Sequence, residues 1–118
     1  MSGRDPEADA VFRDILASYA ESPAMEAKRM FGSDALTVDG EIACFVTKQG
    51  QLVAKLPDAT SERLLGAGLA KPMALGGKRP MTGWFAIPFS DDVDWFALAA
   101  EAVDHVHALE AAKSEQAR

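Results

Sequence analysis

The pair Asp39-Gly40 constrains the fold of this chain more than any other short stretch, because it separates two strand-like runs. Asp-Gly is typical of a two-residue hairpin turn, in which both positions need a positive φ. The run that follows alternates, which predicts one face with Ile42, Cys44 and Val46 and an opposite face with Ala43 and Phe45. A second turn at Gln49-Gly50 and a third run, 51–56, then complete a three-stranded antiparallel meander.

Helical patterns flank this meander on both sides. Asp5 and Pro6 predict the start of a first helix, which ends before Ser22-Pro23. A short helix follows Asp58 as its cap and stops at Gly68. A long helix is predicted after Ser90, with three acidic residues in its first turn, Asp91, Asp92 and Asp94.

Two further extended pieces are predicted between the second and third helices, near 73–75 and at 81–87. The resulting order is α-β-β-β(-β)-α-β-β-α, in which the bracketed strand is an additional one around Met30. We therefore predict one α+β domain over 1–118: an antiparallel sheet of about five strands with helices mainly on one face, and frayed ends at about 1–4 and 112–118.

The charge of the chain is unevenly distributed. The formal net charge is −6, made up of −4 over 1–27, +3 over 28–79 and −5 over 80–118. The overall acidity argues against nucleic-acid binding, which depends on phosphate contacts. The middle segment still indicates a mildly positive surface for an anionic partner, and the alternative is that acidic helices simply keep a small protein in solution.

Two basic pairs are the candidate partner-binding residues. Lys28-Arg29 precedes Met30-Phe31, and Lys78-Arg79 lies in a glycine-rich loop close to Trp84, a possible stacking platform. The partner would be an unknown protein or a nucleic acid. The alternative is that these residues are ordinary solvated charges, on an edge strand in the case of Lys28 and Arg29.

No catalytic, metal or cofactor site is predicted. Cys44 lies in an apolar strand and is expected in the core, and His105 and His107 are two residues apart, so they point away from each other on a helix. Lys78 is followed by Arg79-Pro80 and a strand, which does not fit a phosphate-binding loop. We expect a non-enzymatic domain without cofactor. The alternative is a small-ligand-binding or enzymatic domain with a pocket between sheet and helices.

The location of the protein is predicted from three features. There is one cysteine, no apolar run of about 20 residues, and an acidic start unlike a signal peptide. We expect a cytoplasmic protein with no membrane segment.

Four short motifs resemble one family. These are "RMFG" at 29–32, "DG" at 39–40, "AGL" at 67–69 and "RPMTGWFAIP" at 79–88. In their order and spacing, over about Val11 to Leu109, they resemble the TfoX/Sxy N-terminal domain family, which is similar in fold to the broader YjbR-like group. The resemblance implies an antiparallel sheet with flanking helices and a bacterial-type regulatory role in natural competence, in larger members with a second, helical domain.

The chain departs from that family pattern at two places near its second strand and at its end. Ser33 and Ala35 stand where family members often have glycine, and the 118 residues contain no second domain. A transcriptional role is therefore not carried over whole. The family supplies no catalytic residues to transfer.

Overall fold

The Asp39-Gly40 pair forms the tight turn that the sequence predicts. In the computed structural model of the protein, φ is +53° at Asp39 and +85° at Gly40. The structure describes residues 6–19, 21–22, 25–30, 33–47, 49–72 and 83–116. The strands joined by this turn pair antiparallel, which confirms the hairpin.

The described residues form a sheet of six strands in the order β1-β2-β3-β4-β6-β5. All neighbouring strands pair antiparallel. Their bounds are β1 Met25–Met30, β2 Ser33–Val38, β3 Glu41–Val46, β4 Gln51–Lys55, β5 Lys71–Pro72 and β6 Trp84–Pro88. The first four strands follow one another as a meander, which confirms the predicted three-stranded meander and the additional strand around Met30. The strand predicted near 73–75 lies outside the described residues, and β5 is only two residues long.

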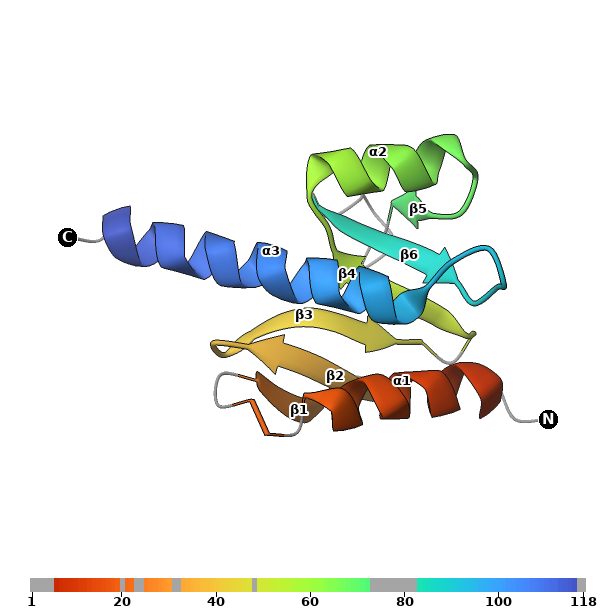
Figure 1. Cartoon of the computed structure of the whole chain (residues 1–118), viewed down its shortest axis with the longest axis horizontal. Coiled ribbons are helices and arrows are strands. Elements are labelled where there is room, and N and C mark those ends of the chain that lie inside the picture. The colour runs from red at the N-terminus through yellow and green to blue at the C-terminus, as the bar shows by residue number, and fades with distance from the viewer. Residues whose placement is uncertain are drawn as a thin grey trace.

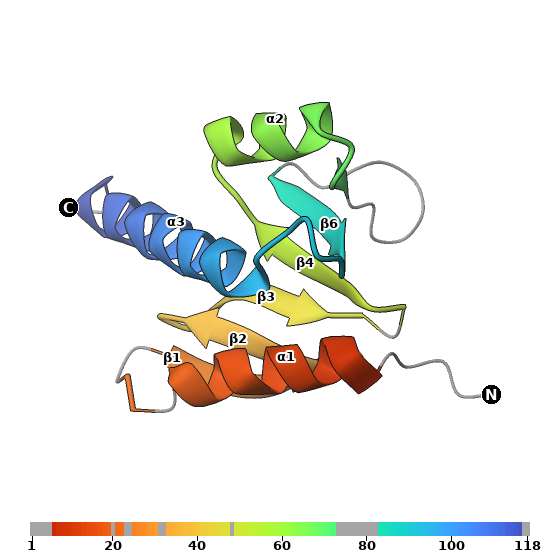
Figure 2. The same ribbon diagram turned by 45° about the vertical axis from the view of Figure 1, so that its right-hand side comes forward.

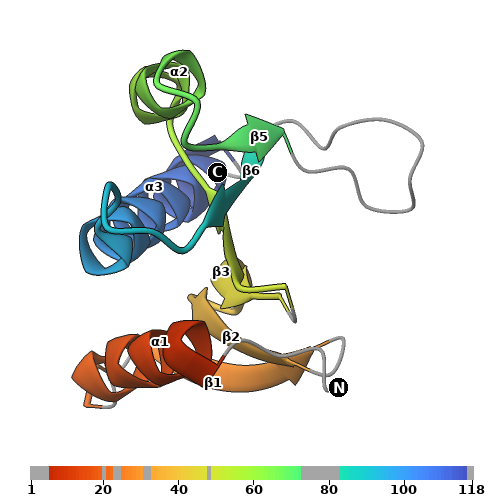
Figure 3. The same ribbon diagram turned by 90° about the vertical axis from the view of Figure 1, so that its right-hand side faces the viewer.

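The three helices among the described residues lie on one face of this sheet, an arrangement that Figures 1 and 3 show. They are α1 Pro6–Ser18, α2 Asp58–Gly66 and α3 Trp95–Gln116. The predicted α+β two-layer fold, its element order and the placement of the helices are therefore confirmed. Of the predicted frayed ends, residues 1–5 and 117–118 lie outside the described residues, and α3 is helical through Gln116.

The main core lies between the helices and the sheet. α1 contributes Phe12 and Ile15 and α3 contributes a row of small and branched residues, all nearly or fully buried. From the sheet they meet Leu36, Val38, Ala43, Cys44, Val46, Leu52, Ala54 and Ile87. A smaller cluster on the opposite face of the sheet consists of Ala35, Phe45, Val53 and Ala86, with Ile42 and Trp84 packed against it.

The prediction for Ile42 was wrong, because β3 contains a bulge. Leu36 pairs with Cys44 and Thr37 pairs with Ile42, so Ala43 is an extra residue in β3. A bulge of this kind reverses the alternation of side chains. Ala43 and Cys44 both face the helices, and Ile42 joins the opposite face.

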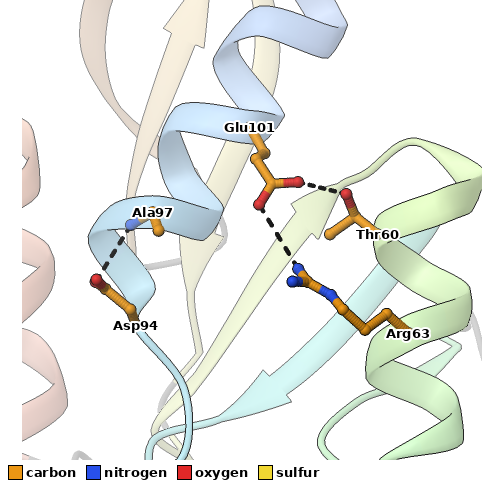
Figure 4. Close-up of polar contacts among 5 residues, drawn as sticks. All are labelled: Thr60, Arg63, Asp94, Ala97 and Glu101. Carbon is orange, nitrogen blue, oxygen red and sulfur yellow. Dashed lines mark hydrogen bonds and ion pairs between the residues drawn. The ribbon is translucent and has the colours of Figure 1, made fainter.

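The predicted starts of the second and third helices also needed correction. Asp58 is the first residue of α2 rather than its cap, and the capping residue Pro57 has no side chain to accept a hydrogen bond. α3 begins at Trp95, and Asp94 caps it by accepting a hydrogen bond of 3.2 Å from the Ala97 N–H (Figure 4). Ser90 instead accepts from the Asp92 N–H in the preceding turn.

Candidate binding pocket

The sheet divides at one end, where β3 and β4 stop pairing. Their ladder runs from Val46–Leu52 to Cys44–Ala54, whereas the first residues of β3 continue to pair with β2. β4 instead follows β6: Lys55 pairs with Trp84, and the next N–H, of Leu56, donates to the Gly83 carbonyl at 3.0 Å. Figures 1 and 2 show the two strands diverging towards the C-terminal half of α3, which passes over the opening.

A cavity of about 510 Å³ occupies this opening. Its wall combines the start of β3, the end of β4, the start of β6 and the last turns of α3. The lining residues are Thr37, Gly40, Glu41, Ile42, Lys55, Trp84, Val106, Leu109, Glu110 and Lys113. We call this cavity the β3–α3 pocket. Four apolar side chains and four charged ones share its wall.

Lys55 and Trp84 form the polar-aromatic corner of the β3–α3 pocket. The Lys55 Nζ lies 5.9 Å from the centre of the Trp84 ring. A cation over an aromatic face is attracted by the ring quadrupole. Both side chains are half-buried. Within the part of the chain that the structure describes, no carboxylate forms an ion pair with Lys55.

The other three charged residues of the pocket are Lys113, Glu110 and Glu41, and two of them form an ion pair with each other. The Lys113 Nζ lies 3.1 Å from the Glu110 Oε2, so these two neutralise each other within α3. Glu41 is exposed at the start of β3. The β3–α3 pocket thus carries two positive and two negative charges, of which one pair is internally satisfied.

A contact between α3 and the β2–β3 turn lies beside the pocket. The His107 Nδ1 and the Asp39 Oδ2 are 2.7 Å apart, and both residues line a neighbouring hollow with Glu110 and Ala111. This contact joins α3 to the hairpin tip that forms one side of the opening. It helps to hold the C-terminal half of α3 over the sheet.

The region between α2 and the first turns of α3 is closed by polar contacts (Figure 4). Glu101 of α3 accepts a hydrogen bond from the Thr60 hydroxyl, and its other oxygen lies 3.7 Å from the Arg63 Nη2. A smaller cavity of about 240 Å³ lies beside this contact. We assign Glu101 a structural role, because it satisfies the buried hydroxyl of Thr60.

The residues predicted to bind a partner do not form one site among the described residues. Lys28 and Arg29 lie on β1, at the edge of the sheet, and Trp84 lies on β6. Four strand-to-strand steps separate β1 from β6, which is a distance of about 19 Å at ~4.8 Å per step. Lys78 and Arg79 lie outside the described residues. Of the predicted residues that the structure describes, Trp84 lines the β3–α3 pocket.

Sequence reasoning missed the other pocket residues, and for Lys55 a signal was available. Lys55 is a lone charge in the apolar run "QLVAKL" and shares the predicted face of Val53. A lone charge in an apolar strand indicates a place where that face of the sheet is accessible to solvent or to a ligand. Nothing in the sequence placed α3 over this position, so Leu109 and Lys113 could not be added.

Cys44 is not part of the pocket's chemistry. It is fully buried in the main core, and burial raises the pKa of its thiol from 9.0 to about 12. The thiol therefore keeps its proton at neutral pH and is no nucleophile. Among the residues that the structure describes, no group of three or more His, Cys, Asp or Glu side chains is placed to hold a metal ion.

The chain was compared with models of protein families and with curated proteins. A family model described as the TfoX N-terminal domain matches residues 16–112, which is 97 of the 118 residues. A search of curated proteins found no match. Within its described residues the chain has no helix long and apolar enough to cross a membrane.

Proposed function

This chain belongs to the TfoX N-terminal domain family, and we propose that it is a non-enzymatic regulatory domain that binds a ligand in the β3–α3 pocket. The observation that carries the proposal is the pocket itself, at the division of the sheet. Its volume of about 510 Å³ is that of a small-molecule site. Its wall combines apolar side chains with a few charged groups, as such sites commonly do.

A non-enzymatic role is supported by the state of the reactive groups near the pocket. The chain's one cysteine is buried and protonated. His107 is engaged by Asp39 beside the pocket, and Glu110 is engaged by Lys113 on its wall. Among the described contacts, none of these three groups belongs to a nucleophile–base pair, which nucleophilic catalysis would require.

A regulatory role is supported by where the pocket lies. One wall belongs to the sheet and the other to the last turns of α3, so a bound ligand contacts both layers at once. A ligand shifts an equilibrium between conformations only through different contacts with each of them. A ligand bound here changes the position of the C-terminal half of α3. In this proposal, the position of that helix is the property that the ligand regulates. We place the protein in the cytoplasm, in keeping with its free thiol.

A fragment screen tests this proposal. Ligand-observed NMR on the full chain measures binding of a library of small aromatic and aliphatic fragments. Leu109→Trp fills the pocket from α3, and Leu65→Trp places the same side chain at an exposed site on α2 as a matched control.

We expect fragments to bind the wild type and Leu65→Trp, and to be lost in Leu109→Trp. Circular dichroism establishes that both variants are folded. The proposal is wrong if no fragment binds the wild type, or if the fragments that bind are retained by a folded Leu109→Trp variant.

A further inference from the structure

We infer that the β3–α3 pocket selects a ligand carrying a single carboxylate on a flat, apolar body, with Lys55 as the ionic partner of that carboxylate. This inference rests on the proposed function and specifies the ligand of the same site. Three features of the pocket support it: the partners of Lys55, the apolar walls, and the two glutamates.

Lys55 is the pocket residue whose ammonium is available to bind an anionic group of a ligand. Lys55 is a half-buried residue on the pocket wall, and no described carboxylate pairs with its ammonium. Its one described partner is the ring of Trp84, at 5.9 Å. A cation gains most from a charged acceptor, because a charge-assisted hydrogen bond is about twice as strong as a neutral one. A ligand carboxylate beside Trp84 supplies that acceptor.

The remaining residues of the pocket wall favour a ligand whose main part is apolar. Ile42 faces the pocket from β3, and Val106 and Leu109 face it from α3. The Trp84 ring adds an aromatic surface that is only half-buried. Aromatic rings prefer offset or edge-to-face contact with one another. A flat ring fits between Trp84 and the branched side chains, with its carboxylate directed to Lys55.

The two glutamates limit the ligand to one negative charge. Glu41 and Glu110 also line the pocket, and the charge of Glu110 is already balanced by Lys113. A dianionic phosphate or a polyanion brings further negative charge close to Glu41 with only Lys55 to compensate. Like charges at short range are repulsive. This arrangement favours a small monocarboxylate over a nucleic acid.

A matched set of probes and variants tests the inference. Isothermal titration calorimetry measures the binding of 2-naphthoate, its uncharged amide 2-naphthamide, and the cation 2-naphthylmethylammonium to the full chain. The variants are Lys55→Gln, Lys55→Arg and, as a control, Lys71→Gln on the exposed β5 strand. The two Gln variants remove the same charge at two different places.

We expect 2-naphthoate to bind the wild type about tenfold more tightly than 2-naphthamide, as a hydrogen bond to a charged group allows. Lys55→Gln removes this preference, Lys55→Arg retains it, and Lys71→Gln leaves it unchanged. The preference also weakens as salt is added.

Two outcomes overturn the inference, and they differ from a failure of the proposed function. Equal binding of acid and amide, or tighter binding of the cation, removes the carboxylate selectivity while the pocket remains a binding site. Selectivity that survives in Lys55→Gln shows that another residue provides it. Loss of every probe, together with a fragment screen that finds no ligand, defeats the proposed function as well.

Discussion

Cys44 shows how burial in the core changes the pKa of a single side chain. Its side chain is fully buried between α3 and the centre of the sheet, and burial raises the pKa of the thiol to about 12. The unfolded chain loses this proton above pH 9.0, the ordinary value, whereas the folded protein keeps it up to about pH 12. Between these values the unfolded state binds fewer protons, so stability falls as pH rises.

This pKa shift predicts a measurable loss of stability in alkali. Relative to Cys44→Ala, the wild type is expected to lose about 1.4 kcal/mol of unfolding free energy for each pH unit above 9. Urea denaturation at about pH 8 and about pH 10, with reductant present, measures the difference. Burial also raises the pKa of Tyr19, and the charges of Cys44 and Asp104 raise it further, so the comparison reports Cys44 together with its effect on Tyr19. Identical pH dependence of the two proteins would show that the thiol is not held in its neutral form.

At the scale of elements, the end of α2 shows how one glycine stops a helix. The Gly68 N–H donates to the Leu65 carbonyl and the Leu69 N–H donates to the Leu64 carbonyl, which is the Schellman arrangement. Gly68 has φ +74°, a conformation that other residues adopt only at a cost. Gly66, two residues earlier, is still helical.

Replacing each of these two glycines by alanine is expected to change the unfolding free energy in opposite directions. A Cβ at either position meets no atom within 4 Å, so packing does not distinguish them. Gly68→Ala is expected to lower the unfolding free energy by about 1 kcal/mol, because alanine is strained at positive φ. Gly66→Ala is expected to raise it by about 0.5 kcal/mol, because it reduces the freedom of the unfolded chain. Urea denaturation measures both, and two changes of the same sign would contradict the assignment of the helix end.

The elements also show what the sequence could and could not predict. The Asp39-Gly40 turn and the Gly68 stop depend on backbone conformations that few residues adopt, so local sequence was sufficient. The bulge in β3 was not predictable, because Ala43 fits either face of a sheet. The start of α3 was misplaced because Ser90 and Asp94 are both good caps, and only the structure shows that Asp94 is the one used.

The pocket belongs to the scale of the whole molecule. Its wall draws on residues between Thr37 and Lys113, from β2 to α3, and it exists because β3 leaves β4 where α3 crosses the sheet. Alternation and turn signals describe neighbours in sequence, so they could not reveal it. The predicted contact by Lys28, Arg29, Lys78, Arg79 and Trp84 stays a prediction, and among its described members Trp84 lines the pocket.

The position of a bound ligand tests the central claim most directly, namely that the divided sheet and α3 form a binding site. A ¹H–¹⁵N correlation spectrum of the labelled chain, titrated with 2-naphthoate, reports which backbone amides change. The account predicts that the changes concentrate at Glu41-Ile42, Lys55, Trp84 and 106–113, and that α2 is unaffected. Changes centred on α2 or on β1, or no saturable change at any amide, would contradict it.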